Sequence, residues 1–488
     1  MAYHTGIYLL LFLPAVLLLY QLAPKKSRWI TLLAAGYLFF WICSGKLVLY
    51  LLGTSLFTHY IAVWISWIKT KCNDETAGMQ RTEAGTIKKA YKKKEKGILV
   101  FGICVLLGIM AYLKYYNFFI QNVNVLLAQG GSSLALGTKQ MLIPVGISFY
   151  TLQAIGYMAD VYWEKVEVFR HPGKIALFLG FFPQIMEGPI SSYAQTADTL
   201  FEGNPLTMEN LAQGSARIFW GLFKKLLIAD RLYLLVDVIF NNYQYHYGEM
   251  IVIVAIAYTT QLYMEFSGCM DIIIGSGKMF GVTLPENFRQ PFFSKSAAEF
   301  WRRWHITLGR WFREYVYIPL GGNRKGKART IFNLFVVWSL TAVWHGAEGH
   351  FLIWGASLLL LLALEKAFLL QFLKKSKILS HVYLVLVVPL TWMAFAIADV
   401  GQLGVYYARM FPFFGVGETV RQMDFLQYLK DYGPLFLMGI VFSTPYPTAL
   451  YKVFEKKWLG SLVVIVVLGL SLYYMAVSTN NPFLYFNF

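Results

Sequence analysis

The chain has 488 residues, of which 57% are hydrophobic and only 14% are charged. Soluble domains carry about a quarter charged residues, so this composition excludes an ordinary soluble enzyme and predicts an all-α, polytopic membrane protein. The net charge of +17 does not indicate nucleic acid binding, because the basic residues are concentrated in short segments between apolar runs. Such a bias orients membrane proteins in the bilayer.

Apolar runs long enough to cross about 30 Å of hydrocarbon recur along the chain. Together with the shorter runs and those interrupted by Gly or Pro, they predict about eleven transmembrane helices. Residues 1–22 lack a basic start and a small-residue cleavage site, so we expect a first transmembrane helix there and no cleaved signal peptide. The clearest runs are residues 6–22, 29–43, 46–68, 97–119, 351–370 and 459–477.

The first 119 residues are expected to hold four ordinary spans and a long basic loop at residues 69–96. Within that loop, the stretch KKAYKKKEK predicts a solvated helix that is attracted to anionic lipid headgroups. If Met1 lies outside the cell, this loop and the basic residues 25–28 both lie inside. Residues 378–488 return to apolar spans, which we interpret as scaffold. The whole chain is therefore predicted to form one membrane domain.

The middle region, residues 141–372, differs because Pro, Gly and charged residues break its apolar runs. Examples are PVGISFYTLQ at residues 144–153 and FFPQIMEGPISS at residues 181–192. Helix breakers at membrane depth are tolerated only where protein or a water-filled cavity satisfies the backbone. We therefore expect re-entrant or interfacial helices in this region, beside a funnel.

Two carboxylates, Glu265 and Asp271, lie in the apolar stretch EFSGCMDIIIGSGKM. Buried carboxylates need ionic or hydrogen-bonding partners. The pair could orient a histidine, bind the acceptor of a reaction, or bridge to Lys278 or to an arginine. The sequence leaves these alternatives open.

Residues 299–315 predict one amphipathic helix. At about 100° per residue its aromatic side chains form one stripe, its arginines lie opposite, and His305 lies at the edge of the stripe. Most of the arginines are expected to anchor the helix at the membrane surface. An alternative is that some of them, with Arg303 and Arg310 as candidates, bind the phosphates of an anionic donor such as coenzyme A. The following IPLGGNR, residues 318–324, predicts a Gly-rich turn.

His345 ends the apolar run IFNLFVVWSLTAVWH and is followed by Gly346. An ionisable side chain at membrane depth is costly, which favours a functional role over one in packing. A neutral imidazole can take a proton from an attacking hydroxyl. We therefore predict His345 and His305 as catalytic residues, and no metal site. The candidate substrate-binding residues are Trp304, Arg303, Arg310, Asp271, Glu265 and Trp344.

Several motifs resemble the membrane-bound O-acyltransferase family, and most of all its branch that contains the membrane subunit of bacterial alginate O-acetylation. They are PVGISFYTLQ, GPI (188–190), EFSGCMD, PENF (285–288), EFWRRWHITLGRWFREYVYIPLGGNR (299–324) and WHG (344–346). The resemblance implies a bundle of about eleven transmembrane helices around a central funnel. It places His345 at the family's essential histidine position and His305 at the second one.

The same resemblance implies that cytosolic acetyl-CoA is the donor substrate, with no permanently bound cofactor, and that a polysaccharide such as alginate is the final acceptor. It further implies a separate extracytoplasmic partner protein of the SGNH hydrolase fold, and a location in the bacterial cell (inner) membrane. Two departures concern the funnel and the acceptor side. GPISS stands where a more basic GPIVR-like run is expected, and AEGHF follows WHG.

Three alternatives stay open at this point. One is D-alanyl transfer to teichoic acid, because that branch of the family shares PENF and a helix containing WH. Another is a transporter or flippase, although transporters usually show matched halves and here the polar motifs occur only in the middle region. The third is a scaffold without chemistry of its own, against which the two histidines argue.

Overall fold

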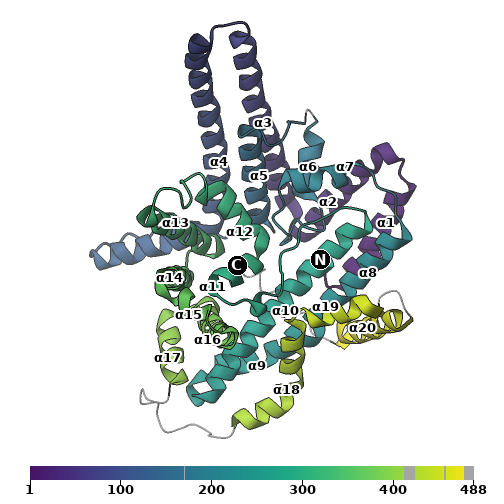
Figure 1. Ribbon diagram of the computed structural model, residues 1–488, viewed down its shortest axis with the longest axis vertical. Coiled ribbons are helices and arrows are strands. Elements are labelled where there is room, and N and C mark those ends of the chain that lie inside the picture. The colour runs from purple at the N-terminus through teal and green to yellow at the C-terminus, as the bar shows by residue number, and fades with distance from the viewer. Residues whose placement is uncertain (170, 412–423, 455–457, 478–488) are drawn as a thin grey trace. The chain divides into compact units, whose positions relative to one another are not determined.

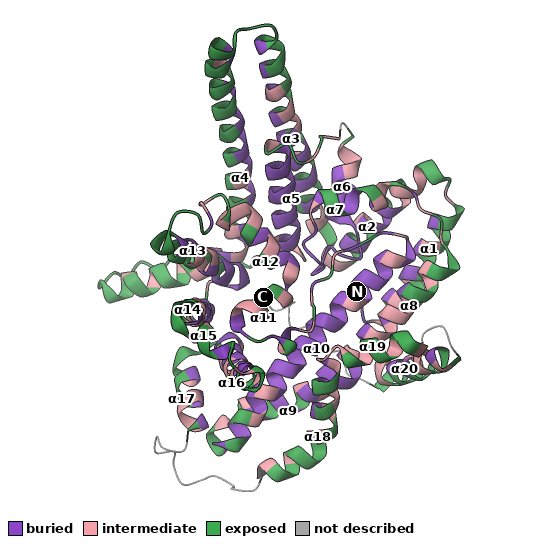
Figure 2. Ribbon diagram, viewed as in Figure 1, coloured by how far each residue is buried: buried purple, intermediate pink, exposed green. Residues whose placement is uncertain are grey.

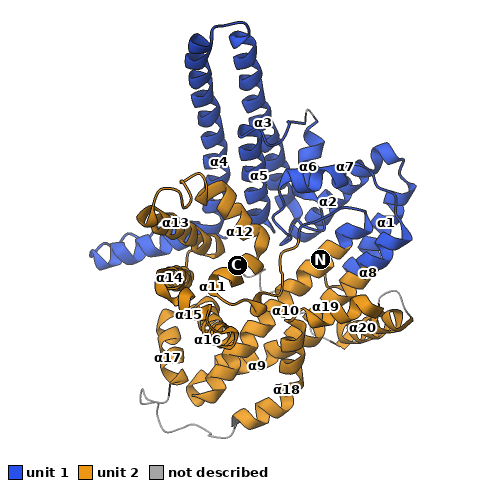
Figure 3. Cartoon of the chain, in the orientation of Figure 1, with its two compact units in different colours: residues 1, 7–214, 276–285 blue, residues 2–6, 215–275, 286–488 orange. Residues whose placement is uncertain are grey.

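The computed structural model describes residues 1–169, 171–411, 424–454 and 458–477. These residues form helices, turns and loops and no strand, which confirms the all-α class. They divide into two compact units (Figure 3). Unit 1 comprises residues 1, 7–214 and 276–285, and unit 2 comprises residues 2–6, 215–275 and 286–488. The organisation of the chain as a single membrane domain stays a prediction.

Unit 1 is built mainly from helices α1 to α7 (Figure 1). Helix α3 packs against α4, α5 and α6, and α2 packs against α6. The expected first helix is present as a π-helical turn at Ile7–Phe12 that continues into α1. The helix bounds are α1 Leu13–Leu22, α2 Arg28–Ser44, α3 Val48–Thr76, α4 Arg81–Gln129, α5 Ile147–Tyr162, α6 Pro172–Gly180 and α7 Tyr193–Phe201.

The predicted basic loop at residues 69–96 is a helical hairpin. Helix α3 continues to Thr76 and α4 begins at Arg81, so only four residues, 77–80, connect them. The expected helix in KKAYKKKEK is confirmed, but the prediction of a long loop around it is wrong. Lys, Glu and Ala are strong helix formers, and Lys92 pairs with Glu95 one turn later at 3.1 Å, so charge alone does not end these helices.

Unit 2 contains most of the remaining helices, and α8 and α10 each have residues in both units. Helix α13 packs on α14, and α14 packs on α16. Short π-helical turns η4 (Phe223–Ala229), η7 (Arg313–Tyr317) and η8 (Glu365–Leu369) follow α8, α12 and α14. The bounds are α8 Met208–Leu222, α9 Asp230–Asn241, α10 Glu249–Met279, α11 Ala297–Arg303, α12 Ile306–Phe312, α13 Lys327–His345, α14 Gly349–Leu364, α15 Leu370–Leu373, α16 Lys377–Ala396, α17 Val400–Met410, α18 Asp424–Phe442, α19 Tyr446–Phe454 and α20 Trp458–Val477.

Six helical segments among the described residues are long and apolar enough to cross a membrane. They are Lys25–Thr76, Arg81–Gln129, Glu249–Met279, Gly349–Leu373, Lys377–Ala396 and Trp458–Val477. Helix α10 is buried along most of its length, whereas α20 exposes most of its apolar side chains, as a lipid-facing helix does (Figure 2). The number of eleven transmembrane helices and the funnel stay predictions.

The predicted single helix over residues 299–315 is wrong. Helix α11 ends at Arg303, Trp304 is extended, and His305 adopts a left-handed conformation with φ of +45° before α12 begins. A left-handed residue ends an α-helix, so the side chains before and after it do not share one helical stripe. The Gly-rich turn at residues 318–324 is confirmed, and both of its glycines have positive φ.

The close approach of α2 to α6 generates a prediction for Gly36. A Cβ atom at this position would lie 2.0 Å from the carbonyl oxygen of Gly180, so Gly36→Ala must push the two helices apart. We expect a loss of about 1–3 kcal/mol of stability, seen as a lower midpoint of thermal unfolding in detergent. The matched control is Gly53→Ala on α3, where a Cβ meets no atom within 4 Å. Equal midpoints for the two variants would contradict the packing described here.

Candidate active site

His345 is the last residue of α13, and the backbone of that helix determines which nitrogen of the neutral ring carries the proton. Its Nδ1 lies 2.8 Å from the carbonyl oxygen of Thr341, one turn earlier. A carbonyl oxygen only accepts hydrogen bonds, so Nδ1 carries the proton. In the neutral ring, Nε2 therefore holds the lone pair that can accept a proton.

Close packing holds the His345 ring in place. The ring meets Trp354 and Phe395 edge to face, with centroids 5.0 Å and 5.5 Å away. The glycine that follows is required sterically, because a Cβ on Gly346 would lie 2.2 Å from the ring of Phe351. The WHG motif thus combines His345 with the one residue type that permits this packing.

His305 lies between α11 and α12 and is 3% exposed. Its Nδ1 is 3.3 Å from Oδ1 of Asn287. Its Nε2 is buried and has no hydrogen-bond partner among the described residues. The ring packs against Phe266 in an edge-to-face contact, with the two centroids 5.0 Å apart and the planes nearly perpendicular.

The two histidines share a neighbour and an electrostatic environment. The ring of Trp344 lies 6.2 Å from that of His305 and 4.9 Å from that of His345. Burial lowers the pKa of His305 well below its ordinary value of 6.5, and the charge that His345 can carry lowers it further. His305 is therefore a neutral imidazole at physiological pH.

Both histidines line one cavity of about 620 Å³ in unit 2. Its wall is mainly aromatic and aliphatic, which suits the apolar part of a small substrate. Cationic side chains also line it and suit an anionic carrier group. The aromatic lining residues include Trp301, Trp304, Trp338, Trp354 and Trp392, and the charged ones are Arg302, Arg310, Arg313, Lys366 and Glu365.

Glu365 is a buried carboxylate that caps the start of α11. Its Oε1 accepts hydrogen bonds from the backbone N–H of Ala297 and from the hydroxyl of Tyr383, the latter at 3.0 Å. Its Oε2 accepts from the backbone N–H of Ala298 at 3.0 Å. A carboxylate at a helix N-terminus satisfies unpaired N–H groups and interacts favourably with the helix dipole. Glu365 thereby ties η8 to the helix that leads into His305.

The structure separates the other predicted site residues into two groups. Trp304 and Arg310 line the cavity together with the two histidines. Arg303 instead pairs with Glu299 at 2.6 Å, and it is absent from the cavity lining. Trp344 contacts both histidines but is likewise absent from the lining.

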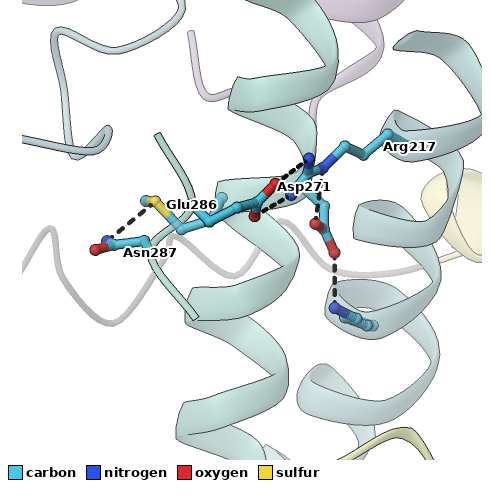
Figure 4. Close-up of polar contacts among 6 residues, drawn as sticks. Arg217, Asp271, Glu286 and Asn287 are labelled. Carbon is cyan, nitrogen blue, oxygen red and sulfur yellow. Dashed lines mark hydrogen bonds and ion pairs between the residues drawn. The ribbon is translucent and has the colours of Figure 1, made fainter. Parts of the chain in front are cut away.

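The two carboxylates of α10 are held in ion pairs outside the cavity lining. Asp271 contacts Arg217 at 3.1 Å and Lys224 at 2.6 Å (Figure 4). Glu265 contacts Lys225 at 2.7 Å. Of the alternatives that the sequence left open, the structure shows bridging to basic residues. These basic residues lie on α8 and η4. Their role in substrate binding stays a prediction.

Sequence reasoning missed Asn287, Thr341 and Glu365. Asn287 stands in PENF, but its contact with His305 depends on a helix break that periodicity does not show. Thr341 acts through its backbone carbonyl, which no residue type signals. Glu365 could have been found from the sequence, because a lone carboxylate in the apolar run LLLLLALEKAFLL needs a buried partner.

Known proteins show clear similarity to this chain. The family model described as the membrane-bound O-acyltransferase family matches residues 171–398. A probable alginate O-acetylase AlgI of Pseudomonas syringae pv. tomato is 35% identical over 415 residues, covering 85% of this chain and 76% of that protein. A peptidoglycan O-acetyltransferase of Helicobacter pylori is 27% identical over 100% of this chain and 97% of its own. A teichoic acid D-alanyltransferase of Bacillus subtilis is 28% identical, covering 43% of this chain and 56% of its own.

The Glu365 cap generates a prediction about stability. In Glu365→Gln, an NH₂ group replaces one acceptor oxygen and the negative charge at the helix end is lost. We expect a loss of about 1–3 kcal/mol, measured as a lower midpoint of thermal unfolding in detergent. Tyr383→Phe is the matched control because it removes only the hydroxyl donor, and it should cost less. The capping role of Glu365 would be refuted if Tyr383→Phe lowered the midpoint of thermal unfolding as much as Glu365→Gln does.

Proposed function

This chain belongs to the membrane-bound O-acyltransferase family, and we propose that it moves an acetyl group from cytosolic acetyl-CoA across the membrane for O-acetylation of an extracellular polysaccharide. Membership of this family makes the protein an acyltransferase and a multi-pass membrane protein. The transporter and scaffold alternatives are therefore set aside.

The observation that carries the proposal is the pair of histidines in one cavity. In His345 and in His305, Nδ1 is engaged by an oxygen acceptor, so the neutral rings have their lone pairs on Nε2. A general base needs such a lone pair and a ring held in one orientation. The apolar cavity wall restricts water, which competes with a sugar hydroxyl for the acyl group.

In the proposed reaction His345 is the general base. Its Nε2 takes the proton of the acceptor hydroxyl as that oxygen attacks the thioester carbonyl. The bond between carbon and sulfur then breaks, and the imidazolium returns the proton to the departing thiolate. The Thr341 carbonyl, which accepts from Nδ1, stabilises the imidazolium between these steps. His305 positions the thioester or the acceptor.

The arginines of the cavity support an anionic donor. Arg302, Arg310 and Arg313 line the same cavity as the histidines. Arginine suits phosphate groups because its planar guanidinium donates two parallel hydrogen bonds. We propose that they receive the phosphates of acetyl-CoA, with the acetyl group lying deeper among the tryptophans.

An acetyl donor is favoured over a D-alanyl donor on two grounds. The relatives with O-acetyl names match 85% and 100% of this chain, whereas the D-alanyltransferase of Bacillus subtilis matches 43%. A D-alanyl group also carries an ammonium, which needs a carboxylate partner. Glu365 is the one carboxylate among the described residues that line the cavity, and both of its oxygens already accept hydrogen bonds from α11.

The acceptor side follows from the relatives and not from residues that recognise a sugar. We propose that the protein lies in the bacterial cell membrane and works with a separate extracytoplasmic SGNH-type protein that completes transfer to the polysaccharide. Alginate is the proposed acceptor class because the relatives named probable alginate O-acetylase are 34–35% identical over most of the chain.

The histidine assignment predicts the loss of acetyl transfer in single variants. His345→Ala and His305→Ala should each lower transfer from radiolabelled acetyl-CoA by about 10²–10⁴-fold in nanodiscs, because a positioned acid or base contributes that much. The matched control is His350→Ala, a buried histidine near His345 that does not line the cavity. It should keep near-normal activity. A folded His345→Ala protein that acetylates at the normal rate would refute the assignment.

The donor assignment has its own test. Purified protein with its extracytoplasmic partner is offered acetyl-CoA or a D-alanyl thioester, each labelled on the acyl group. We expect label on the acceptor only with acetyl-CoA, since the cavity offers no uncommitted carboxylate to an ammonium. Comparable transfer of both acyl groups would contradict the proposed specificity.

A further inference from the structure

Asn287, the third residue of PENF, is completely buried and contacts the segment that carries His305. Its Oδ1 lies 3.1 Å from the backbone nitrogen of Thr307, 2.9 Å from Oγ1 of Thr307 and 3.3 Å from Nδ1 of His305. Its Nδ2 lies 3.3 Å from the sulfur of Met270 (Figure 4). Every polar atom of this side chain therefore has a partner.

These contacts determine which way the Asn287 amide points. The backbone N–H of Thr307 can only donate, so the atom facing it must be the amide oxygen. The same oxygen faces Nδ1 of His305, which must then carry the proton. The unpartnered Nε2 is left as the lone-pair nitrogen of His305.

Asn287 also accounts for the break before α12. His305 occupies the position before the first residue of α12, but its own side chain makes no capping hydrogen bond. Asn287 supplies the cap, because its backbone carbonyl accepts from Ile306 at 3.0 Å and its side chain accepts from Thr307. A left-handed non-glycine residue costs about 1–3 kcal/mol and persists only where its surroundings enforce it. Here the enforcing residue is Asn287.

We propose that Asn287 is a positioning residue that holds His305, which lines the reaction cavity, in the Nδ1-protonated form and so leaves Nε2 as its lone-pair nitrogen. The inference deepens the proposed function, because it assigns the group that keeps the second histidine ready to bind the thioester or the acceptor. Asn287 itself touches no reacting atom. It acts only through His305.

An ion-pair network anchors the loop that carries Asn287. The neighbouring Glu286 pairs with Arg217 through two contacts of 2.6 Å each (Figure 4). Arg217 also contacts Asp271, and Asp271 contacts Lys224. Bidentate arginine pairs fix geometry better than single contacts do. The network thus ties the PENF loop to α8 and α10 through the residue that directly precedes Asn287.

The first test uses Asn287→Asp. A carboxylate keeps the acceptor for Thr307 and His305 but adds a negative charge, which raises the pKa of His305. The other ionisable groups around the site, His345 and the charged side chains of the cavity, are unchanged. We expect the acid limb of the rate profile for acetyl transfer to move up by about one pH unit. Asn287→Leu should lower kcat by about 10²-fold with little change in the KM for acetyl-CoA.

The matched control is Asn333→Asp. Asn333 is equally buried, lies on α13, and donates to the carbonyl of Gly322 at 2.8 Å. The Asn333→Asp variant introduces the same charge at a residue that does not contact His305. Its pH profile for acetyl transfer should therefore match that of the wild type. The proposal is overturned if folded Asn287→Asp protein shows the wild-type profile, or if Asn333→Asp shifts the profile equally.

A second measurement needs neither activity nor a folded Asn287 variant. Nitrogen-15 NMR of histidine-labelled wild-type protein in nanodiscs reports the tautomer of each ring, and the His305 signal is identified by its loss in His305→Gln. We expect His305 to be protonated at Nδ1. Protonation at Nε2 would overturn the positioning role, whether or not acetyl-CoA is the donor. The expected tautomer in a protein inactive with acetyl-CoA would instead leave this inference standing and remove the proposed function.

Discussion

The backbone N–H groups at the start of α12 impose the constraint on which this site depends. They lie in the interior of the protein, where an unpaired amide costs about 1–3 kcal/mol. The side chain of His305 makes no capping hydrogen bond to its own helix, and the cap comes from Asn287 on a different segment. Once that cap is made, the chain can turn sharply at His305. The histidine, Trp304, Arg302 of α11 and Arg310 of α12 then line one cavity.

The sequence was sufficient for the membrane class and for the Gly-rich turn after α12, because each depends on local composition. It also singled out the two histidines that line one cavity, and their catalytic role stays a prediction. It was insufficient for the break between α11 and α12. Residues 299–315 have helical periodicity throughout, and a left-handed histidine has no signature in residue type. The group that stabilises the break stands 18–20 positions earlier in the chain, so no window over the helix contains it.

The carboxylates of α10 show a related limit. Burial in an apolar stretch required that Asp271 have a partner, and this much could be predicted. Lys278 stands on the same helix face but two turns away, about 10 Å along the axis, which is too far for an ion pair. The actual partners, Arg217 and Lys224, come from neighbouring elements. Partner identity is a property of helix packing, which one sequence does not reveal.

Helix α4 has a consequence for where its lysines can lie. Its 49 residues make a helical path of about 74 Å at 1.5 Å per residue, more than twice the hydrocarbon thickness. The lysines of its first half and its apolar stretch therefore belong to one uninterrupted helix, with no linker between them. Because backbone hydrogen bonds join the two parts, the positive charge is not carried on a flexible tether.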